Sequence, residues 1–109
     1  MPHADELLTL EERLTGIGWE VVLREFNIDC TDIDLLVRKE NSRGMNYLLI
    51  EEKGGRKARI KKATKQVKLG MRYVIDNYNL ERLWGLRAHR QAVYKVGVYE
   101  KRIEVENEK

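Results

Sequence analysis

Two carboxylates and a lysine lie in neighbouring apolar segments, at a spacing that suits a bound metal ion. Asp34 interrupts one apolar segment, and Glu51 and Lys53 end the next one. Carboxylate oxygens are hard ligands of the kind that Mg²⁺ and Mn²⁺ prefer. A lysine ammonium beside them adds a positive charge and three hydrogen-bond donors. These residue types favour a divalent-metal site, provided that the fold brings the two segments together.

Apolar periodicity predicts the elements that must position these residues. The predicted order is a helix, three strands and a second helix, followed by one to three strands in the last third of the chain. There, Leu83–Arg90 fits a strand or a helix, while Ala92–Tyr99 and Arg102–Val105 resemble short strands. The earlier elements are a helix over 4–15, strands over 19–26, 32–40 and 45–53, and a helix over 57–78.

A hairpin register follows from the apolar pattern of the second and third strands. With the turn centred between Ser42 and Arg43, opposed residue numbers add up to 85, which places Leu35 opposite Ile50. A slip by one residue would mix the two faces of the sheet. In this register Asp34 lies opposite Glu51, and opposed Cβ atoms are about 4.5–5.5 Å apart. Two facing acids repel each other, so a divalent cation between them is expected.

Basic residues are concentrated in one stretch, which the net charge of +3 conceals. No acidic residue lies between Lys53 and Ile75. Such a segment favours a polyanionic partner and binds the phosphates of a nucleic acid without reading its sequence. The basic residues expected to contact nucleic acid are Arg56, Lys57, Lys61, Lys62, Lys65, Lys68 and Arg72.

The pattern Asp34-x16-Glu51-Glu52-Lys53 resembles the core motif of the PD-(D/E)XK nucleases. The apolar strands around both acids, the glycine that follows, the acidic first helix and the basic second helix extend the resemblance over about residues 4 to 75. It implies an α/β, restriction-endonuclease-like fold, with an α-β-β-β-α-β core and a mixed sheet flanked by helices. It also implies Mg²⁺- or Mn²⁺-dependent hydrolysis of phosphodiester bonds in DNA, as in archaeal Holliday-junction resolvases.

The resemblance implies a role for each residue of the site. Asp34 and Glu51 would hold the metal, with Glu6 of the first helix as an extra ligand. Lys53 would orient the attacking water or neutralise charge on the phosphorane. Gln66 resembles the glutamine that family members often carry in the helix after the motif, and it would hydrogen-bond the water or a phosphate oxygen.

Several assignments within the motif stay open. Thr31-Asp32 stands where many members have Pro-Asp, so Asp32 competes with Asp34, although the hairpin register favours Asp34. Glu52 competes with Glu51 but is expected on the side of Ile33 and Ile50. Glu11 and Glu12 compete with Glu6 for the role in the first helix. Trp19 and Trp84 are expected to fill the core or an interface.

The chain is short enough to form one domain, taken as residues 1–109. Cys30 is the only cysteine, which fits a reducing compartment. No apolar run approaches the ~20 residues of a membrane span, and the first residues lack a signal-peptide pattern. A cytoplasmic (intracellular) protein without membrane contact is therefore expected. Cleavage of both strands of a duplex usually needs two active sites, so we expect a homodimer that pairs through Val93–Val105.

Two rival functions stay open. A domain of this fold could bind nucleic acid without cleaving it, or serve only as a subunit of a repair or restriction complex. Divalent-metal binding would separate a nuclease from both. The pattern does not distinguish DNA from RNA or an endonuclease from an exonuclease. Because no base-reading motif is present, we expect structure-specific or non-sequence-specific recognition.

Overall fold

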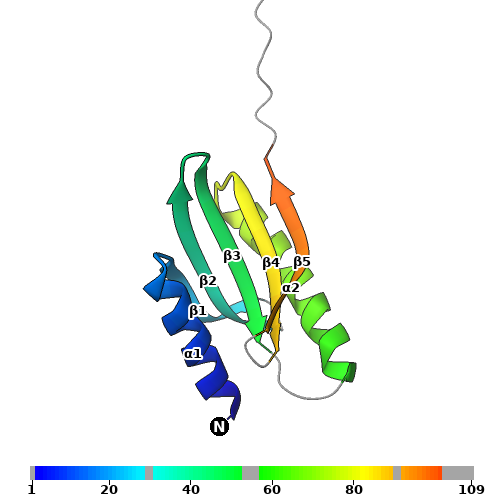
Figure 1. The fold of residues 1–109 in the computed structure, drawn as a ribbon. Helices are drawn as coiled ribbons and strands as arrows, with labels where there is room; N and C mark the ends of the chain where they lie inside the picture. The colour runs from blue at the N-terminus through cyan, green and yellow to red at the C-terminus, as the bar shows by residue number, and fades with distance from the viewer. Residues whose placement is uncertain (1, 29–30, 53–56, 90–91, 102–109) are drawn as a thin grey trace, which may run out of the picture.

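The computed structural model describes residues 2–28, 31–52, 57–89 and 92–101, and the side chains within 7–27, 32–52, 60–88 and 92–101. Within these ranges, two helices and five strands follow one another, and the strands form a single sheet (Figure 1). The elements are α1 (Pro2–Gly16), β1 (Glu20–Ile28), β2 (Thr31–Asn41), β3 (Gly44–Glu52), α2 (Lys57–Asn77), β4 (Arg82–His89) and β5 (Ala92–Glu100).

The sheet is mixed, with its strands in the order β1-β2-β3-β4-β5. The first three strands are antiparallel neighbours, whereas β4 lies parallel to β3 and antiparallel to β5. A parallel neighbour needs a crossover connection, and α2 supplies it. The predicted α/β class and the mixed sheet flanked by helices are therefore confirmed. Neither helix in the described ranges is long and apolar enough to cross a membrane.

The structure shows which elements form in the last third of the chain, where the sequence pattern fitted a strand or a helix. Leu83–Arg90, which fitted a helix or a strand, corresponds to β4, and the strand expected over Ala92–Tyr99 is β5. The further strand expected over Arg102–Val105 lies outside the described residues. Among the described strands, β5 pairs with β4 alone, so β5 and β1 are the two edges of the sheet as far as the described residues show it.

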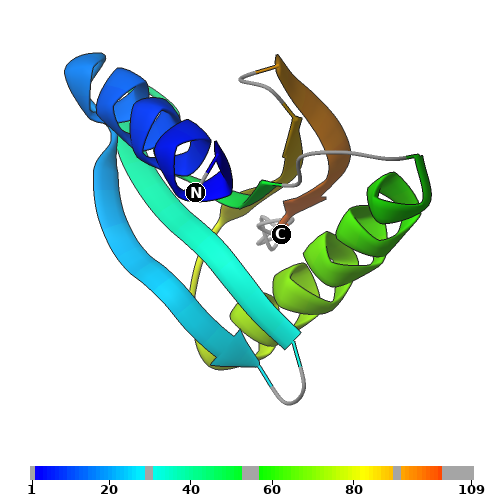
Figure 2. The ribbon, with the colours of Figure 1, turned by 90° about the horizontal axis from the view of Figure 1, so that it is seen from below.

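Each helix covers one face of the sheet, as the view in Figure 2 shows. On the α1 face, Leu10 packs with Leu35, Val37 and Ile50 of the sheet. On the α2 face lies the larger cluster, which contains Ile33, Leu36, Leu49, Val67, Met71, Val74, Leu80 and Leu83. The stripes of leucines in α1 and of apolar residues in α2 were both expected, because apolar side chains three and four residues apart share one side of a helix.

Close packing between α2 and the sheet explains two glycines. A Cβ atom at Gly70 would lie 2.8 Å from Ile33 Cδ1, and one at Gly85 would lie 2.7 Å from Val67 Cγ1 and overlap Met71 Sδ. Gly70 therefore lowers the intrinsic stability of the helix but lets α2 approach β2 closely. This approach is what places the basic helix directly over the sheet.

The hairpin of β2 and β3 has the predicted register. Leu35 pairs with Ile50, Leu36 with Leu49 and Val37 with Leu48, and the two-residue loop Ser42-Arg43 closes the turn. Gly44 has φ +114°, which favours glycine, and Asn41 Oδ1 accepts a hydrogen bond from the Arg43 N–H at 2.8 Å. The ladder stops at Leu35–Ile50, one pair before Asp34 and Glu51.

Candidate functional site

The strand β2 changes its orientation at Asp34. Leu35 and Val37 belong to the α1 face and Leu36 to the α2 face, as regular alternation requires. Ile33 should then share the α1 face with Leu35, but it packs in the α2 cluster. We expected Ile33 to share one face of the strand with Leu35 and Val37, and this expectation was wrong. Asp34 lies where the strand turns over, and this explains why its ladder pair with Glu51 is not formed.

The neighbouring strand is irregular at the same level. In the register of β1 with β2, the pairs Arg24–Leu35 and Phe26–Ile33 flank the position of Glu25 and Asp34. Glu25 has φ +43°, in the left-handed region that side chains with a Cβ atom rarely adopt. Backbone conformations of this kind cost free energy and concentrate at functional sites. The irregularity of both strands is thus centred on two acidic residues.

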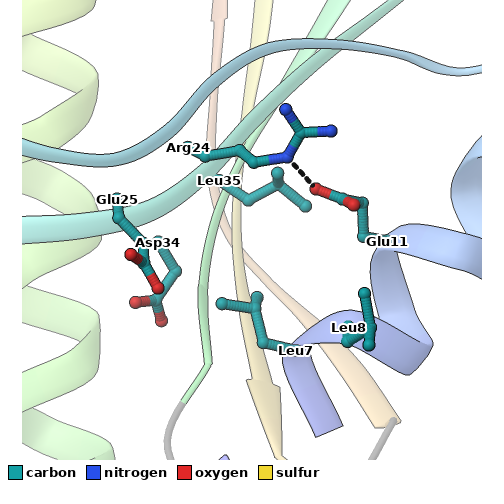
Figure 3. Close-up of a pocket in the computed structure, with 7 residues that line it drawn as sticks. All are labelled: Leu7, Leu8, Glu11, Arg24, Glu25, Asp34 and Leu35. Carbon is teal, nitrogen blue, oxygen red and sulfur yellow. Dashed lines mark hydrogen bonds and ion pairs between the residues drawn. The ribbon is translucent and has the colours of Figure 1, made fainter. Parts of the chain in front are cut away.

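Asp34 and Glu25 line a pocket of about 290 Å³ between α1 and the sheet, here called the Asp34 pocket. Figure 3 shows both side chains on one side of the pocket and the side chains of α1 on the other. Glu11 Oε1 accepts a hydrogen bond from Arg24 Nε at 2.6 Å, so the positive charge of Arg24 is held by an acid of α1. The remaining lining residues are Leu7, Leu8 and Leu35.

The carboxylate of Asp34 is fixed to the end of β3. Its Oδ2 atom accepts a hydrogen bond from the backbone N–H of Glu52 at 2.8 Å. This bond replaces the next rung of the ladder, and it places Asp34 beside the peptide group that joins Glu51 to Glu52. The side chains of Glu51 and Glu52 are 2% and 1% exposed. Two buried acids therefore end β3, and Asp34 is hydrogen-bonded to the backbone between them.

The two glutamates point to different faces of the sheet. Leu49 lies on the α2 face and Ile50 on the α1 face, so alternation continues Glu51 towards α2 and Glu52 towards α1. The expectation that Glu52 lies on the side of Ile50 agrees with this order, but Ile33 is not on that side. Asp34 lies at the break in β2, and its side chain is hydrogen-bonded to the backbone of β3.

The acids at the end of β3 fit a small divalent cation by their chemistry. Carboxylate oxygens are hard donors, and Mg²⁺ commonly takes one or two carboxylates and fills its remaining positions with water. Among the described side chains, no three His, Cys, Asp or Glu residues gather closely enough to hold a metal by themselves. A cation at this place would therefore take at most two of these acids, and water and substrate would complete its coordination.

Other predicted residues of the site are placed only in part. Lys53 and Arg56 lie outside the described residues, although Lys53 follows the last residue of β3 directly in sequence. Glu6 lies in α1 and Lys57 begins α2, but their side chains are not among those described. The structure thus places Asp34 at the end of β3. The roles of Glu6, Lys53, Arg56 and Lys57 stay predictions.

The rival acids differ in their surroundings. Asp32 is exposed, and its Oδ1 atom accepts a hydrogen bond from Asn27 Nδ2 at 2.8 Å, away from the residues that line the Asp34 pocket. In α1, Glu11 lines that pocket and binds Arg24, whereas Glu12 is exposed and is not part of the lining. These placements favour Asp34 over Asp32 as the first acid of the site.

The second helix presents its basic residues to solvent. Five predicted nucleic-acid contacts are exposed: Lys61, Lys62, Lys65, Lys68 and Arg72. Arg72 Nε lies 3.7 Å from Asp76 Oδ2, one turn further along the helix, and the first turn of α2 has no acidic residue. Gln66 is half-buried, and its Oε1 atom has no hydrogen-bond partner among the described residues.

Glu25 is the residue that the sequence analysis missed. Its segment is a strand rich in valine and leucine, and a glutamate there fits an exposed strand position. The register shift of β1 lies earlier, between Val21 and Leu23. Nothing in the residue type predicts a left-handed backbone, since glycine, asparagine and aspartate are the residues that favour it. Only the structure shows Glu25 beside Asp34.

Comparisons with known proteins add no family to these observations. No protein-family model matches the chain, and no curated protein matches it significantly. The functional reading therefore depends on the residues themselves, above all on the acids at the end of β3 and on the basic face of α2.

Proposed function

We propose that the chain is a metal-dependent nuclease that hydrolyses phosphodiester bonds in DNA, with structure-specific or non-sequence-specific recognition. The observation that carries the proposal is the hydrogen bond between Asp34 Oδ2 and the Glu52 N–H. It attaches the acid of β2 to the strand that ends in Glu51-Glu52 and leads into Lys53. These are the residues of the PD-(D/E)XK pattern.

Each residue of the pattern has a chemical task in this proposal. A divalent cation, when bound, lowers the pKa of a water and stabilises charge on the phosphate. Asp34 and Glu51 supply its carboxylate ligands, with Glu6 as an additional one. Lys53 holds the attacking water or neutralises the charge that develops on the phosphate oxygens. Gln66 donates or accepts a hydrogen bond at the water, because its amide offers both kinds of group.

The basic face of α2 supports a nucleic acid as the substrate. Exposed lysines on one helix neutralise successive phosphates, and this contact does not depend on base sequence. The helix packs against β2, β3 and β4, so its basic residues are held in a fixed relation to the acids of β2 and β3. In this proposal the exposed lysines of α2 hold the phosphate backbone of the substrate.

A homodimer belongs to the same proposal. The edge strand β5 has one side without a neighbouring strand among the described residues, and Val93, Tyr94 and Val98 on it are exposed. Edge strands with apolar side chains readily pair with another strand. Antiparallel pairing of two β5 strands would give two active sites related by a twofold axis, as cleavage of both strands of a duplex requires.

The main rival is a domain that binds nucleic acid without cleaving it. The exposed lysines of α2 suit both functions equally. Divalent-metal binding separates the two functions, because a nuclease needs acids of this site as ligands of a cation, whereas a domain that only binds nucleic acid does not.

The experiment that tests the proposal is a cleavage assay on branched, duplex and single-stranded DNA, and on RNA of the same sequence. We expect cleavage of at least one DNA substrate with Mg²⁺ or Mn²⁺, none with EDTA, and none by Lys53→Ala. Absence of cleavage on every substrate, with DNA binding retained and no binding of Mn²⁺, would instead support the non-catalytic rival.

A further inference from the structure

A second pocket lies on the α1 face, at the end of the sheet away from Asp34. It has a volume of about 450 Å³, within the range of sites that bind small molecules. Its lining includes Asn46 and Leu48 near the start of β3, so it lies roughly 20 Å along that strand from Glu52, at ~3.3 Å per residue. Trp19 and Trp84 also line it, and we call it the tryptophan pocket.

Trp84 is not used as a core residue. It is half-buried, and it is part of neither hydrophobic cluster that the described residues form. Lys95 Nζ lies 5.6 Å from the centre of its ring, in the position of a cation–π contact. Proteins that bind single-stranded nucleic acid stack bases on aromatic rings of this kind, with cations nearby.

Trp19 is held firmly on the other side of the pocket. It packs against the α1 cluster, and it follows Gly18, whose φ of +100° ends the connection from α1. Lys39 Nζ donates a hydrogen bond to the carbonyl oxygen of Ile17, and the Lys39 side chain also covers Gly18. These contacts fix the connection between α1 and β1. They hold the Trp19 indole and the Lys39 ammonium at the same pocket.

The charge of the tryptophan pocket suits a phosphate. Lys39 and Arg82 line it, and no carboxylate is among its described lining residues. Arg82 Nη2 lies 3.0 Å from Glu100 Oε1, which neutralises part of this charge. With Lys95 over Trp84, three cations lie at or beside the pocket, while Glu81 and Glu100 line an adjoining pocket that shares Asn46 and Arg82. Two rings flanked by cations complement a base and its phosphate better than they complement an apolar peptide.

We propose that the tryptophan pocket binds an unstacked base of single-stranded nucleic acid through Trp19 and Trp84, with the adjoining phosphate at Lys39 and Arg82. Base–aromatic stacking of this kind tolerates any sequence, because every base has a π face. This site goes beyond the proposed function, since it uses neither Asp34 nor the basic face of α2. It gives the chain a place for a single strand at a distance from the acids.

The test is a titration of the full chain with short oligothymidylate in EDTA, followed by tryptophan fluorescence and by anisotropy of a labelled strand. We expect quenching on binding. Trp84→Ala should weaken binding about 5- to 150-fold, which corresponds to the ~1–3 kcal/mol of one stacked base. Trp84→Phe keeps a ring and should recover most of the affinity. Tyr78→Ala removes an exposed aromatic outside the pocket and should bind as the wild type does.

Binding of the single strand by Trp84→Ala with wild-type affinity would overturn the proposal. So would an equal loss in Tyr78→Ala, or a change of oligomeric state in Trp84→Ala at unchanged affinity, which would make this face a contact between two copies. Circular dichroism and the melting temperature show that each variant is folded. Because the titration is made in EDTA and measures binding alone, a failure of the nuclease proposal does not affect its result.

Discussion

Asp34 Oδ2 and the backbone N–H of Glu52 are joined by a hydrogen bond of 2.8 Å that crosses from β2 to β3 where their ladder has stopped. The bond satisfies a backbone donor next to two buried glutamates, and it fixes the direction of the Asp34 carboxylate. One interaction thus serves both the fold and the candidate site. Substitutions at Asp34 should separate these two roles.

Asp34→Ala should lower the free energy of unfolding more than Asp34→Asn does. Alanine leaves the part-buried Glu52 N–H without its acceptor, which costs about 1–3 kcal/mol of unfolding free energy. Asparagine keeps a side-chain oxygen at the same position. Urea denaturation of both variants measures the difference. Equal stability of the two variants would mean that the bond contributes nothing to the fold.

Glu25→Gly should be tolerated or stabilising. Glycine relieves the left-handed backbone at φ +43°, a conformation that costs other residues about 1–2 kcal/mol. This gain exceeds or offsets the ~0.5–1 kcal/mol that glycine loses in backbone entropy on folding. The matched control is Glu40→Gly at an exposed position of β2, which should lose that entropy without any relief. Thermal melts of both variants provide the comparison, and a larger loss in Glu25→Gly would refute the strain.

Gly85→Ala should destabilise the protein by about 1–3 kcal/mol, the usual cost of overpacking a core. Its methyl group would meet Val67 Cγ1 at 2.7 Å and overlap Met71 Sδ, so α2 must move away from β4. In Gly16→Ala the new methyl group meets nothing within 4 Å, and stability should stay within ~0.5 kcal/mol. Denaturation midpoints of the two variants test how closely α2 packs on the sheet.

Lysines of α2 should determine the salt dependence of duplex DNA binding. Each phosphate contact contributes about 0.9 to the slope of log K against log salt concentration. Lys65→Gln and Lys68→Gln should each reduce the magnitude of that slope by roughly this amount. Lys101→Gln removes an exposed lysine at the end of β5 and should leave it unchanged. Slopes that are identical in all three variants would exclude α2 as the binding face.

Much of the fold could be predicted because its signals are local. The alternation of apolar residues selected the β2–β3 register, and the helical stripes identified α1 and α2. The character of β4 was ambiguous because a short apolar run suits a strand or a helix. Only its pairing with β3, which follows the crossover through α2, decides the matter.

The residues of the candidate site could be proposed from the sequence, but their geometry could not. A period of two assumes that a strand continues without a break, so Asp34 was expected directly opposite Glu51. The reversal between Ile33 and Leu35 and the left-handed backbone of Glu25 come from tertiary packing of three strands and two helices. Trp84 was expected as a filler because its residue type usually is one, and its position outside both clusters became visible only in the structure.

The most direct test of the nuclease proposal compares Asp34→Asn with Asp32→Asn in Mg²⁺-dependent cleavage of branched and duplex DNA. Both substitutions remove one negative charge from β2, and Asp32 lies outside the Asp34 pocket. The account predicts that Asp34→Asn stays folded and binds DNA but loses cleavage by at least about 100-fold, a common scale for removing one group that stabilises the transition state, while Asp32→Asn cleaves as the wild type does. Equal cleavage by wild type and Asp34→Asn, or loss of cleavage only in Asp32→Asn, would contradict it.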